Sequence, residues 1–406
     1  MNAESAEYRT DDGKNYRKTA LHTALAAATE DRIIFDLAGI EARCASLLRE
    51  LPDVSVRFAM KACPVDEVIT CLAKKGVGAD AASPREIAQA IACGVPVDRI
   101  HYGNTIKSDQ DIAEAHRLGI RVFATDSQED VAAIAVHAPG ARVFCRLSTD
   151  GQGALWGLSK KFGCSVDEAV VVLEQARDTG LVPAGLSVHV GSQQMSAQAW
   201  RRVFDNLVHA LELMGRRGIT LDHVNLGGGL PAFGYLDKRG HRLDPPIDKM
   251  FAVIREGMQR CREVSGHRLD FVIEPGRHLV ADHGAIRARV SRLTTRRGPD
   301  GEPRYWLYLS CGKFNGLYEM DELQYPLVFP THDDTDRVPA VVAGPSCDSD
   351  DSYSPEYGLV KVPKGVASGD PVWVLSSGAY AISYMTRGFN GFSPLPYSCL
   401  PGQGER

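Results

Sequence analysis

The sequence predicts an α/β fold, a (β/α)8 TIM barrel followed by a smaller all-β domain. Between residues 54 and 273, eight short apolar or β-branched runs alternate with amphipathic helical segments. Parallel neighbouring strands need crossover helices of this kind. After about Ala281 the helical periodicity fades, and strand-like segments separated by Gly/Pro turns take its place. We therefore expect a barrel at 30–282, and a β-sandwich or barrel-like domain formed by 283–406 with residues 1–29.

Each element is predicted from its apolar spacing. The segment before Thr29 is polar and then weakly helical, 32–37 is strand-like, and 40–51 has helical spacing. The barrel strands are expected at 54–60, 78–81, 99–102, 121–124, 142–147, 185–190, 223–226 and 269–273, with helices that include 84–92, 109–118, 166–179, 197–217 and 249–263. The second domain's strands are expected at 285–292, 304–309, 338–342 and 371–375. An open doubly wound sheet is the alternative, because it shows the same alternation.

Length and composition exclude several classes of protein. A chain of 406 residues favours two domains, and its 44% hydrophobic and 24% charged fractions are those of a soluble globular protein. The net charge of −5 argues against a nucleic-acid partner. No apolar run approaches the length of a membrane span, and the polar first 18 residues lack the core of a secretory signal. The ten cysteines show no CxxC pairs and no metal-type spacing, which predicts reduced thiols in a cytoplasmic protein and no metal site.

Lys61 stands at the end of the predicted strand 54–60, where the chain runs into its loop. Apolar residues on both sides would partly desolvate its ammonium group, which lowers a lysine's pKa and frees the lone pair for Schiff-base chemistry. A lone lysine at a strand end is more often structural, with its stem along apolar surface. The residues at the other strand ends therefore decide between the two interpretations.

Unusual residues recur at the same end of five further strands. In a (β/α)8 barrel, catalytic residues collect where the strands end and the βα loops begin. These strand ends carry Asp80, Arg146, His189, the glycine run 227–229 and the run 274–277. One such residue could be a satisfied polar group of the core, but the whole set predicts an active site.

Part of this set suits a phosphate group. The glycines at 227–229 leave backbone N–H groups bare, although a tight turn is the commoner reason for such a run. Leu230 and Pro231 follow where a dinucleotide-binding fingerprint would continue into a helix, so that fingerprint is excluded. Ser192 and Arg277 would complete a phosphate cradle, with Arg277 as a bidentate donor.

The remaining strand-end residues suit a flat heteroaromatic ring. An imidazole at His189 can stack on a planar ligand, and a carboxylate at Glu274, with its direction fixed by the proline that follows, can hold a proton on a ring nitrogen. With a Schiff-base lysine and a phosphate cradle, these residues describe pyridoxal 5'-phosphate (PLP). Metal, nucleotide and acyl-transfer sites do not use that combination.

Two loops of the second domain add to this pattern. The segment 344–351 places the Cys347 thiol beside acidic groups. It resembles a calcium loop, but Tyr353 and Leu359 occupy the positions that need glycine and the final glutamate. Tyr380 follows another apolar run and offers a phenol that could reach a phosphate.

From about Ile33 to Phe392 the chain resembles the fold-type III PLP-dependent amino-acid decarboxylases, the ornithine/lysine/diaminopimelate decarboxylase family. The matching motifs stand in family order at 58–63, 78–83, 189–192, 227–229, 274–277, 344–348, 378–380 and 389–392. The resemblance implies an alanine-racemase-like barrel, PLP as cofactor, and decarboxylation of an α-amino acid. A basic substrate such as ornithine or lysine, giving a diamine and CO2, is the first expectation.

The resemblance also implies a role for each site residue. Lys61 would carry the cofactor as a Schiff base, and Asp80 would support it. His189 would stack on the pyridine ring, Glu274 would pair with its nitrogen, and Arg146 would brace the groups beside the ring. The phosphate would be held by Ser192, Gly228, Gly229, Arg277 and Tyr380, and Gly276 would also belong to the cofactor-binding residues.

A head-to-tail homodimer with shared active sites is a further implication. In this family the loop that matches Cys347 and Asp348 completes the active site of the other subunit. In the ornithine enzymes its thiol protonates the α-carbon after CO2 leaves, and its aspartate takes the distal amine of the substrate. Both residues are present here, which favours a substrate with a distal cationic group.

The segment 311–319 departs from the family pattern. The ornithine enzymes usually have a slightly longer segment there, which ends in a second substrate-binding aspartate, and Glu319 is expected to serve instead. This version resembles decarboxylases of specialised pathways, such as siderophore or antibiotic assembly. A specialised decarboxylase or a diaminopimelate-type enzyme is therefore the alternative.

Three other functions share parts of the pattern. An amino-acid racemase of this fold needs a base on the opposite face of the ring, usually a tyrosine. A non-catalytic regulator would usually have lost the lysine or the thiol, whereas Lys61 and Cys347 are both present. A single-barrel PLP carrier protein would lack residues 285–406.

Overall fold

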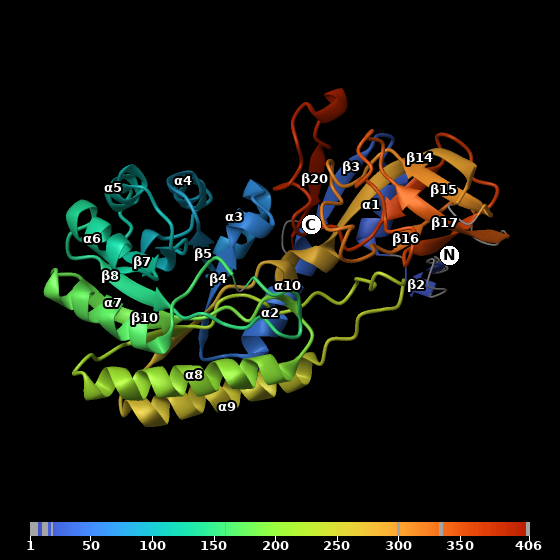
Figure 1. Ribbon diagram of the computed structural model, residues 1–406. Coiled ribbons are helices and arrows are strands. Elements are labelled where there is room, and N and C mark those ends of the chain that lie inside the picture. Colours follow the sequence, from blue (N-terminus) through green and yellow to red (C-terminus); the bar gives the residue numbers. More distant parts are fainter. Residues whose placement is uncertain are drawn as a thin grey trace, which may run out of the picture. The chain divides into compact units, whose positions relative to one another are not determined.

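The structure, a computed structural model, describes residues 7–9, 15–17, 19–158, 160–298, 301–332 and 336–402. These residues form two compact units. Figure 1 shows them with colours that follow the sequence. The barrel unit contains residues 41–231 and 245–278, and the sheet unit contains the described residues of 1–40, 232–244 and 279–406. The predicted division put residues 30–40 with the barrel. They belong to the sheet unit, because β3 (Arg32–Asp36) pairs with two of its strands.

The barrel unit is built on eight parallel strands. They are β4 (Val54–Ala59), β5 (Gly78–Ala81), β6 (Ile100–Tyr102), β7 (Val122–Thr125), β8 (Arg142–Arg146), β10 (Val182–Ser187), β12 (His223–Asn225) and β13 (Asp270–Ile273). The strands close in the order β10-β12-β13-β4-β5-β6-β7-β8, and every neighbouring pair is parallel. The predicted (β/α)8 barrel is therefore confirmed, and the open doubly wound sheet is wrong.

Helices alternate with these strands along the chain. They are α2 (Leu37–Glu50), α3 (Asp66–Lys74), α4 (Pro84–Ala92), α5 (Asp109–Arg117), α6 (Gln128–His137), α7 (Val166–Asp178), α8 (Ala197–Arg216) and α9 (Ile247–Ser265). Four of them begin after a serine whose hydroxyl accepts the backbone N–H of the third helical residue: Ser83, Ser108, Ser127 and Ser165. A serine cap contributes about 1 kcal/mol, and it defines where a βα loop ends.

The two longest helices, α8 and α9, lie side by side (Figure 1). A Cβ atom at Gly257 of α9 would lie 2.1 Å from Cγ of Phe204 on α8. Phe204 is fully buried. Because position 257 has no side chain, this ring can pack directly on the backbone of α9.

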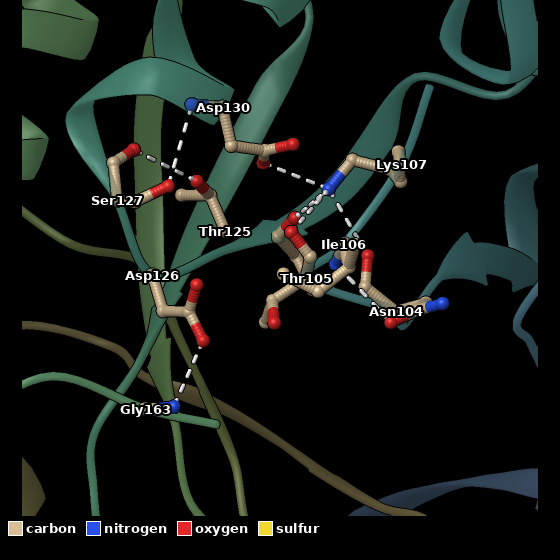
Figure 2. A network of polar contacts seen from close by, with 10 residues as sticks. Asn104, Thr105, Ile106, Lys107, Thr125, Asp126, Ser127, Asp130 and Gly163 are labelled. Carbon is tan, nitrogen blue, oxygen red and sulfur yellow. Dashed lines mark hydrogen bonds and ion pairs between the residues drawn. The ribbon is translucent and has the colours of Figure 1, made fainter. Parts of the chain in front are cut away.

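A buried lysine holds the loop that follows β6. Lys107 Nζ donates to Asp130 Oδ2 at 2.8 Å, to the Ala124 carbonyl at 2.7 Å and to the Asn104 carbonyl at 3.0 Å (Figure 2). The Lys107 and Asp130 side chains are 0% and 8% exposed. The ion pair thus ties this loop to the start of α6, at the end of the barrel where the strands finish.

The sheet unit is organised around the long strand β14 (Gly284–Arg297), which pairs antiparallel with β3. The other strands are β15 (Pro303–Leu309), β16 (Leu327–Val328), β17 (Arg337–Ala343), β18 (Leu359–Pro363), β19 (Pro371–Val374) and β20 (Tyr397–Leu400). The sheet runs β16-β19-β14-β15-β17-β18, and β20 joins it through β3. Its core includes Ile34, Ala285 and Trp373, packed with Leu21 and Leu25 of α1 (Ala20–Ala27). The predicted β domain is confirmed.

The first 18 residues contribute a short antiparallel pair, β1 (Glu7–Arg9) and β2 (Asn15–Arg17). Among the described residues, no helix is both long enough and apolar enough to cross a bilayer.

Candidate active site

Lys61 lies in a short 3-10 turn, η1 (Met60–Ala62), directly after β4. Met60 and Ala62 are buried, whereas Lys61 is exposed. Partial desolvation of its ammonium group stays a prediction, and the position of Lys61 just beyond the strand is the predicted one. Its positive charge acts on Asp80 and on His189, two other predicted site residues.

Asp80, His101 and Glu274 meet at the carboxyl ends of β5, β6 and β13. His101 Nε2 lies 3.2 Å from Asp80 Oδ1 and 2.8 Å from Glu274 Oε1. Because an ionised carboxylate only accepts hydrogen bonds, one Nε2–H is shared between the two oxygens. His101 is not among the site residues predicted from the sequence. The available signal was a histidine between two apolar residues of a barrel strand.

The charges of this trio support one another. Burial alone would raise the pKa of Asp80, but the hydrogen bond and charge of His101 hold that pKa below its ordinary value, with a further contribution from Lys61. Burial and the Arg57 charge lower the pKa of His101, but its bonds to the two carboxylates outweigh them and leave that pKa raised. An ionised Asp80 beside a protonated His101 satisfies both directions.

Asn225, the last residue of β12, also holds Glu274. Its Nδ2 donates to Glu274 Oε1, and its Oδ1 accepts the Gly227 N–H at 2.9 Å. The second bond decides which way the amide points. Since Asn225 and His101 both bind Oε1, the other oxygen, Oε2, is the one placed for a further N–H donor.

The glycine run after β12 forms a loop that has no room for side chains. A Cβ at Gly227 would lie 2.0 Å from the Val188 carbonyl oxygen, and one at Gly228 would lie 3.1 Å from His189 Nε2. Gly227 and Gly229 have φ values of 65° and 116°, which side chains disfavour. A bare backbone loop beside His189 is what a phosphate held by amides requires.

Ser192 and Arg277 lie together in the structure. Arg277 donates to Ser192 Oγ from Nη2 at 3.0 Å and from Nε at 3.3 Å, and its guanidinium lies 4.6 Å from the centre of the Trp156 ring. Ser192 and Trp156 belong to the antiparallel pair β11 (Ser192–Gln194) and β9 (Ala154–Trp156). Arg277 is only 4% exposed. A buried guanidinium that is bonded along one edge and stacked on one face is preorganised for an anion.

Gly276 brings two predicted motifs into contact. A Cβ there would lie 2.7 Å from Cβ of Ala62. The turn that carries Glu274 can therefore lie against η1, which carries Lys61.

His189 has a defined tautomer. Its Nδ1 accepts the Gly191 N–H at 3.0 Å, so the proton of the neutral ring is on Nε2. Burial, together with the charges of Arg146 and Lys61, holds the pKa of His189 well below its ordinary value. A neutral, half-buried imidazole ring is suited to stacking on a planar ligand.

Arg146 ends β8 and faces the same carboxylates. Burial lowers its pKa, and the charges of Glu274 and Asp80 oppose that shift. Its guanidinium lies 5.0 Å from the centre of the Phe162 ring. The barrel unit thus brings together Lys61, Asp80, Arg146, His189, Ser192, Gly228, Gly229, Glu274, Gly276 and Arg277.

The other predicted residues belong to the sheet unit. Cys347 donates its backbone N–H to Asn390 Oδ1 at 3.0 Å, and its sulfur lies 3.1 Å from Asn390 Nδ2. All ten cysteines lie within the described residues and are outside disulfides, and Cys347 is the one that is exposed. Asp348 is exposed beside it. The structure thus joins the motifs 344–348 and 389–392.

Asp351 ties this loop to the divergent segment 311–319. Its carboxylate is buried and accepts the Lys313 N–H at 2.6 Å and the Ser346 N–H at 3.0 Å. Side chains are excluded around it, because a Cβ at Gly312 or Gly344 would lie 2.1 or 2.2 Å from Oδ1. In the sequence, Asp351 stands only at the end of an acidic run.

Aromatic contacts connect the remaining sheet-unit motifs. The rings of Tyr318 and Tyr384 stack at 3.9 Å, Tyr380 lies 5.9 Å from Tyr384, and Phe314 lies 4.6 Å from Phe389. Tyr380 has a φ of 61°, an uncommon backbone conformation for a residue with a side chain. The contact between Tyr380 and a phosphate stays a prediction.

Glu319 differs from Asp348 in its surroundings. Asp348 is exposed, whereas Glu319 is only 7% exposed. A buried carboxylate is more commonly held by protein partners than offered to a ligand. Its substrate-binding role stays a prediction, which mutation can test.

The fold and this donor set define a PLP-binding enzyme. Residues 37–281 match the family model described as "Pyridoxal-dependent decarboxylase, pyridoxal binding domain". The lysine/ornithine decarboxylase of Selenomonas ruminantium is 30% identical over 92% of this chain and 90% of its own length. The ornithine decarboxylase of Schizosaccharomyces pombe is 28% identical over 88% of this chain and 81% of its own.

Solved structures agree with the sequence comparisons. A lysine/ornithine decarboxylase from Vibrio vulnificus complexed with putrescine has a TM-score of 0.80 and 28% identity, over 94% of this chain and 99% of that one. The structure of SrLDC with PLP and cadaverine has a TM-score of 0.81 and 27% identity, over 95% of both chains. The chain therefore belongs to the family of pyridoxal-dependent decarboxylases, and the predicted cofactor and enzyme class are confirmed.

Proposed function

We propose that this enzyme decarboxylates a basic amino acid, ornithine or lysine, to the corresponding diamine and CO2. One observation carries the choice of substrate. The exposed Cys347 and Asp348 share a loop that Asn390 and Asp351 fix in place. A thiol next to a carboxylate suits a substrate that needs a proton at its α-carbon and carries a distal cation. Relatives named lysine/ornithine decarboxylase support the same choice.

The site residues divide the work between cofactor and substrate. PLP, when bound, supplies an electron sink for the electrons left by the departing CO2. We assign Lys61 to the covalent attachment of PLP, and His189 to stacking on its ring. Glu274 Oε2 holds the proton of the ring nitrogen. The bare loop at 227–229, with the Ser192–Arg277 pair, holds the phosphate, and Tyr380 is proposed as a further phosphate ligand.

We assign two acid–base and charge roles to the sheet unit. Cys347 returns a proton to the α-carbon, and Asp348 receives the distal ammonium group. Glu319 is a second candidate for that ammonium group. The divergent segment 311–319 keeps one alternative open, a specialised decarboxylase with a larger conjugated substrate.

We propose a homodimer in which the loop of Cys347 from one subunit completes the active site of the other. Exposed aromatic side chains in the motifs connected to this loop support the proposal. Tyr318, Tyr384 and Phe389 are 41%, 46% and 36% exposed. Aromatic residues are enriched at interfaces and are rarely left exposed in a group without a partner. Ten cysteines outside disulfides support a reducing, cytoplasmic location.

The experiment that tests the proposed function is a substrate panel. The holoenzyme is incubated with ornithine, lysine, arginine, diaminopimelate and siderophore-type conjugates, and CO2 and amine are measured. We expect turnover to be fastest with ornithine or lysine. Turnover confined to conjugates would favour the specialised decarboxylase, and inversion of chirality without CO2 release would indicate a racemase.

A further inference from the structure

We propose that His101 is a positioning residue, which clamps Asp80 and Glu274 through one shared Nε2–H and so fixes Glu274 Oε2 for the ring nitrogen of PLP. The inference rests on the proposed function through the role of Glu274. No sequence motif assigns His101 a role.

The first support is the geometry of the shared proton. Nε2 lies 3.2 Å from Asp80 Oδ1 and 2.8 Å from Glu274 Oε1, and His101 is 2% exposed. Two partly buried carboxylates that share one cation repel each other less than two unpaired ones. A single N–H that both accept also fixes their separation.

The second support is the space made for the clamp. His101 lies in β6, and Gly103 follows two residues later, just beyond the end of the strand. Residues two apart in an extended chain face the same side. A Cβ at Gly103 would lie 1.8 Å from Asp80 Oδ1. The missing side chain at 103 is therefore what allows the Asp80 carboxylate to reach the imidazole.

The third support is that Asn225 and His101 restrain the same oxygen of Glu274. Asn225 donates to Oε1, and its own orientation is fixed by the Gly227 N–H. With Oε1 held by two donors, rotation of the carboxylate is restricted and Oε2 keeps one direction. That direction determines how well Glu274 holds the ring proton on which the electron sink depends.

Other charged groups act on the clamp from neighbouring strands. The pKa of His101 is affected by the charge of Arg57 on β4 and by the carboxylates on β5 and β13. His101 in turn lowers the pKa of His223 on β12. Arg146 on β8 interacts electrostatically with both carboxylates. Burial keeps the pKa of His223 low, so this ring adds no competing positive charge at neutral pH. Because the pKa of His101 is raised, the stabilisation that its positive charge adds is complete below the ordinary histidine pKa and is lost as pH rises through the folded-state value. The neutral ring that remains can still donate from Nε2.

The test compares His101→Leu, His101→Gln and His101→Asn with wild type. Leucine removes the donor, glutamine keeps a neutral N–H donor of similar reach, and asparagine has a shorter one. His137→Gln is the matched control, because His137 lies on α6 with its side chain 33% exposed and pairs with Asp109 at the surface. For each holoenzyme we would measure kcat, KM and the pH dependence of the visible absorption of bound PLP. For each apoprotein we would measure stability in urea as a function of pH.

We expect His101→Leu to lower kcat about 10–100-fold with little change in KM, since outer-shell partners act on the group they orient. The absorption–pH curve should shift in His101→Leu and return towards wild type in His101→Gln. The free energy of unfolding of the wild-type apoprotein should exceed that of His101→Gln at low pH, and this difference should shrink as pH rises. If His101→Leu does not fold, His101→Asn takes its place. We then expect His101→Asn to show the lower kcat and the shifted absorption–pH curve that are expected for His101→Leu.

Three results would overturn the proposal. Unchanged absorption–pH curves in every His101 variant would leave His101 a packing residue only. Equal losses in the leucine and glutamine variants would also exclude a donor role. The third result concerns a metal ion, because the potential ligand atoms of Asp80, His101 and Glu274 lie within 4.8 Å of one another. If a chelator abolished activity and zinc restored it, a metal ion and not the shared proton would link the three side chains. Absence of turnover by wild type on the whole panel would count against the proposed substrate, while the absorption and stability measurements would still test His101.

Discussion

Glu274 is the residue through which the barrel controls the cofactor's electronics. Its Oε1 is bound by His101 and Asn225, so its position does not depend on the cofactor. We expect Glu274→Ala to lower kcat by roughly 10²–10⁴-fold, with a much smaller loss of PLP occupancy. Occupancy is measured from the absorption of the bound cofactor. Glu263→Ala on the exposed face of α9 is the control, and parallel losses of rate and occupancy in Glu274→Ala would refute the assigned role.

The two candidate substrate carboxylates can be separated by mutation. Asp348→Asn should raise KM for a dibasic substrate roughly 10–100-fold, the loss of one charge-assisted bond. Glu319→Gln should raise KM less, because Glu319 is buried. Asp350→Asn serves as the control, since Asp350 is a neighbouring exposed aspartate. A larger KM effect in Glu319→Gln than in Asp348→Asn would transfer the substrate role to Glu319.

The placement of residues that follow a barrel strand within a recognisable motif could be predicted from the sequence, whereas their roles stay predictions. Lys61, Ser192 and Arg277 are of this kind. His101 and Asn225 could not be predicted, because their roles depend on which residues face them across the barrel. Periodicity shows that β6 is buried, but it does not show that two carboxylates from other strands meet His101.

At the scale of elements, the loop after β6 depends on the ion pair of Lys107 and Asp130 (Figure 2). Lys107→Met should destabilise the protein by about 3–5 kcal/mol, because it leaves the Asp130 carboxylate buried and unpaired. The double variant Lys107→Met/Asp130→Leu should recover most of that loss, since a buried pair is often replaceable by apolar residues. Urea unfolding measures both free energies. A double variant no more stable than Lys107→Met would contradict this account.

The elements themselves were predicted closely because short apolar runs and amphipathic helices alternate clearly. The pattern does not say which sheet a strand joins. The strand β3 therefore fell into the wrong predicted domain, although its existence was predicted. Its partners, β14 and β20, are far away in the sequence.

For the whole molecule, the proposed homodimer predicts complementation between two inactive variants. Lys61→Ala and Cys347→Ala should each have little activity alone. Refolded together in equal amounts, they should recover about one quarter of wild-type activity, because half of the dimers are mixed and each mixed dimer has one intact site. Activity is measured before and after mixing. If mass measurement demonstrates mixed dimers but no activity is recovered, each subunit builds its own site.

The identity of the cofactor-bearing lysine is the central claim, and borohydride reduction tests it most directly. Reduction fixes a Schiff base permanently to its lysine, and mass spectrometry of the digested protein then locates the cofactor. We predict that the cofactor is found on the peptide containing Lys61, and on no peptide of Lys61→Ala. Lys249→Ala, a change on the exposed face of α9, should retain the wild-type label. Cofactor fixed to Lys107 or to any other lysine of the wild-type enzyme would contradict the account.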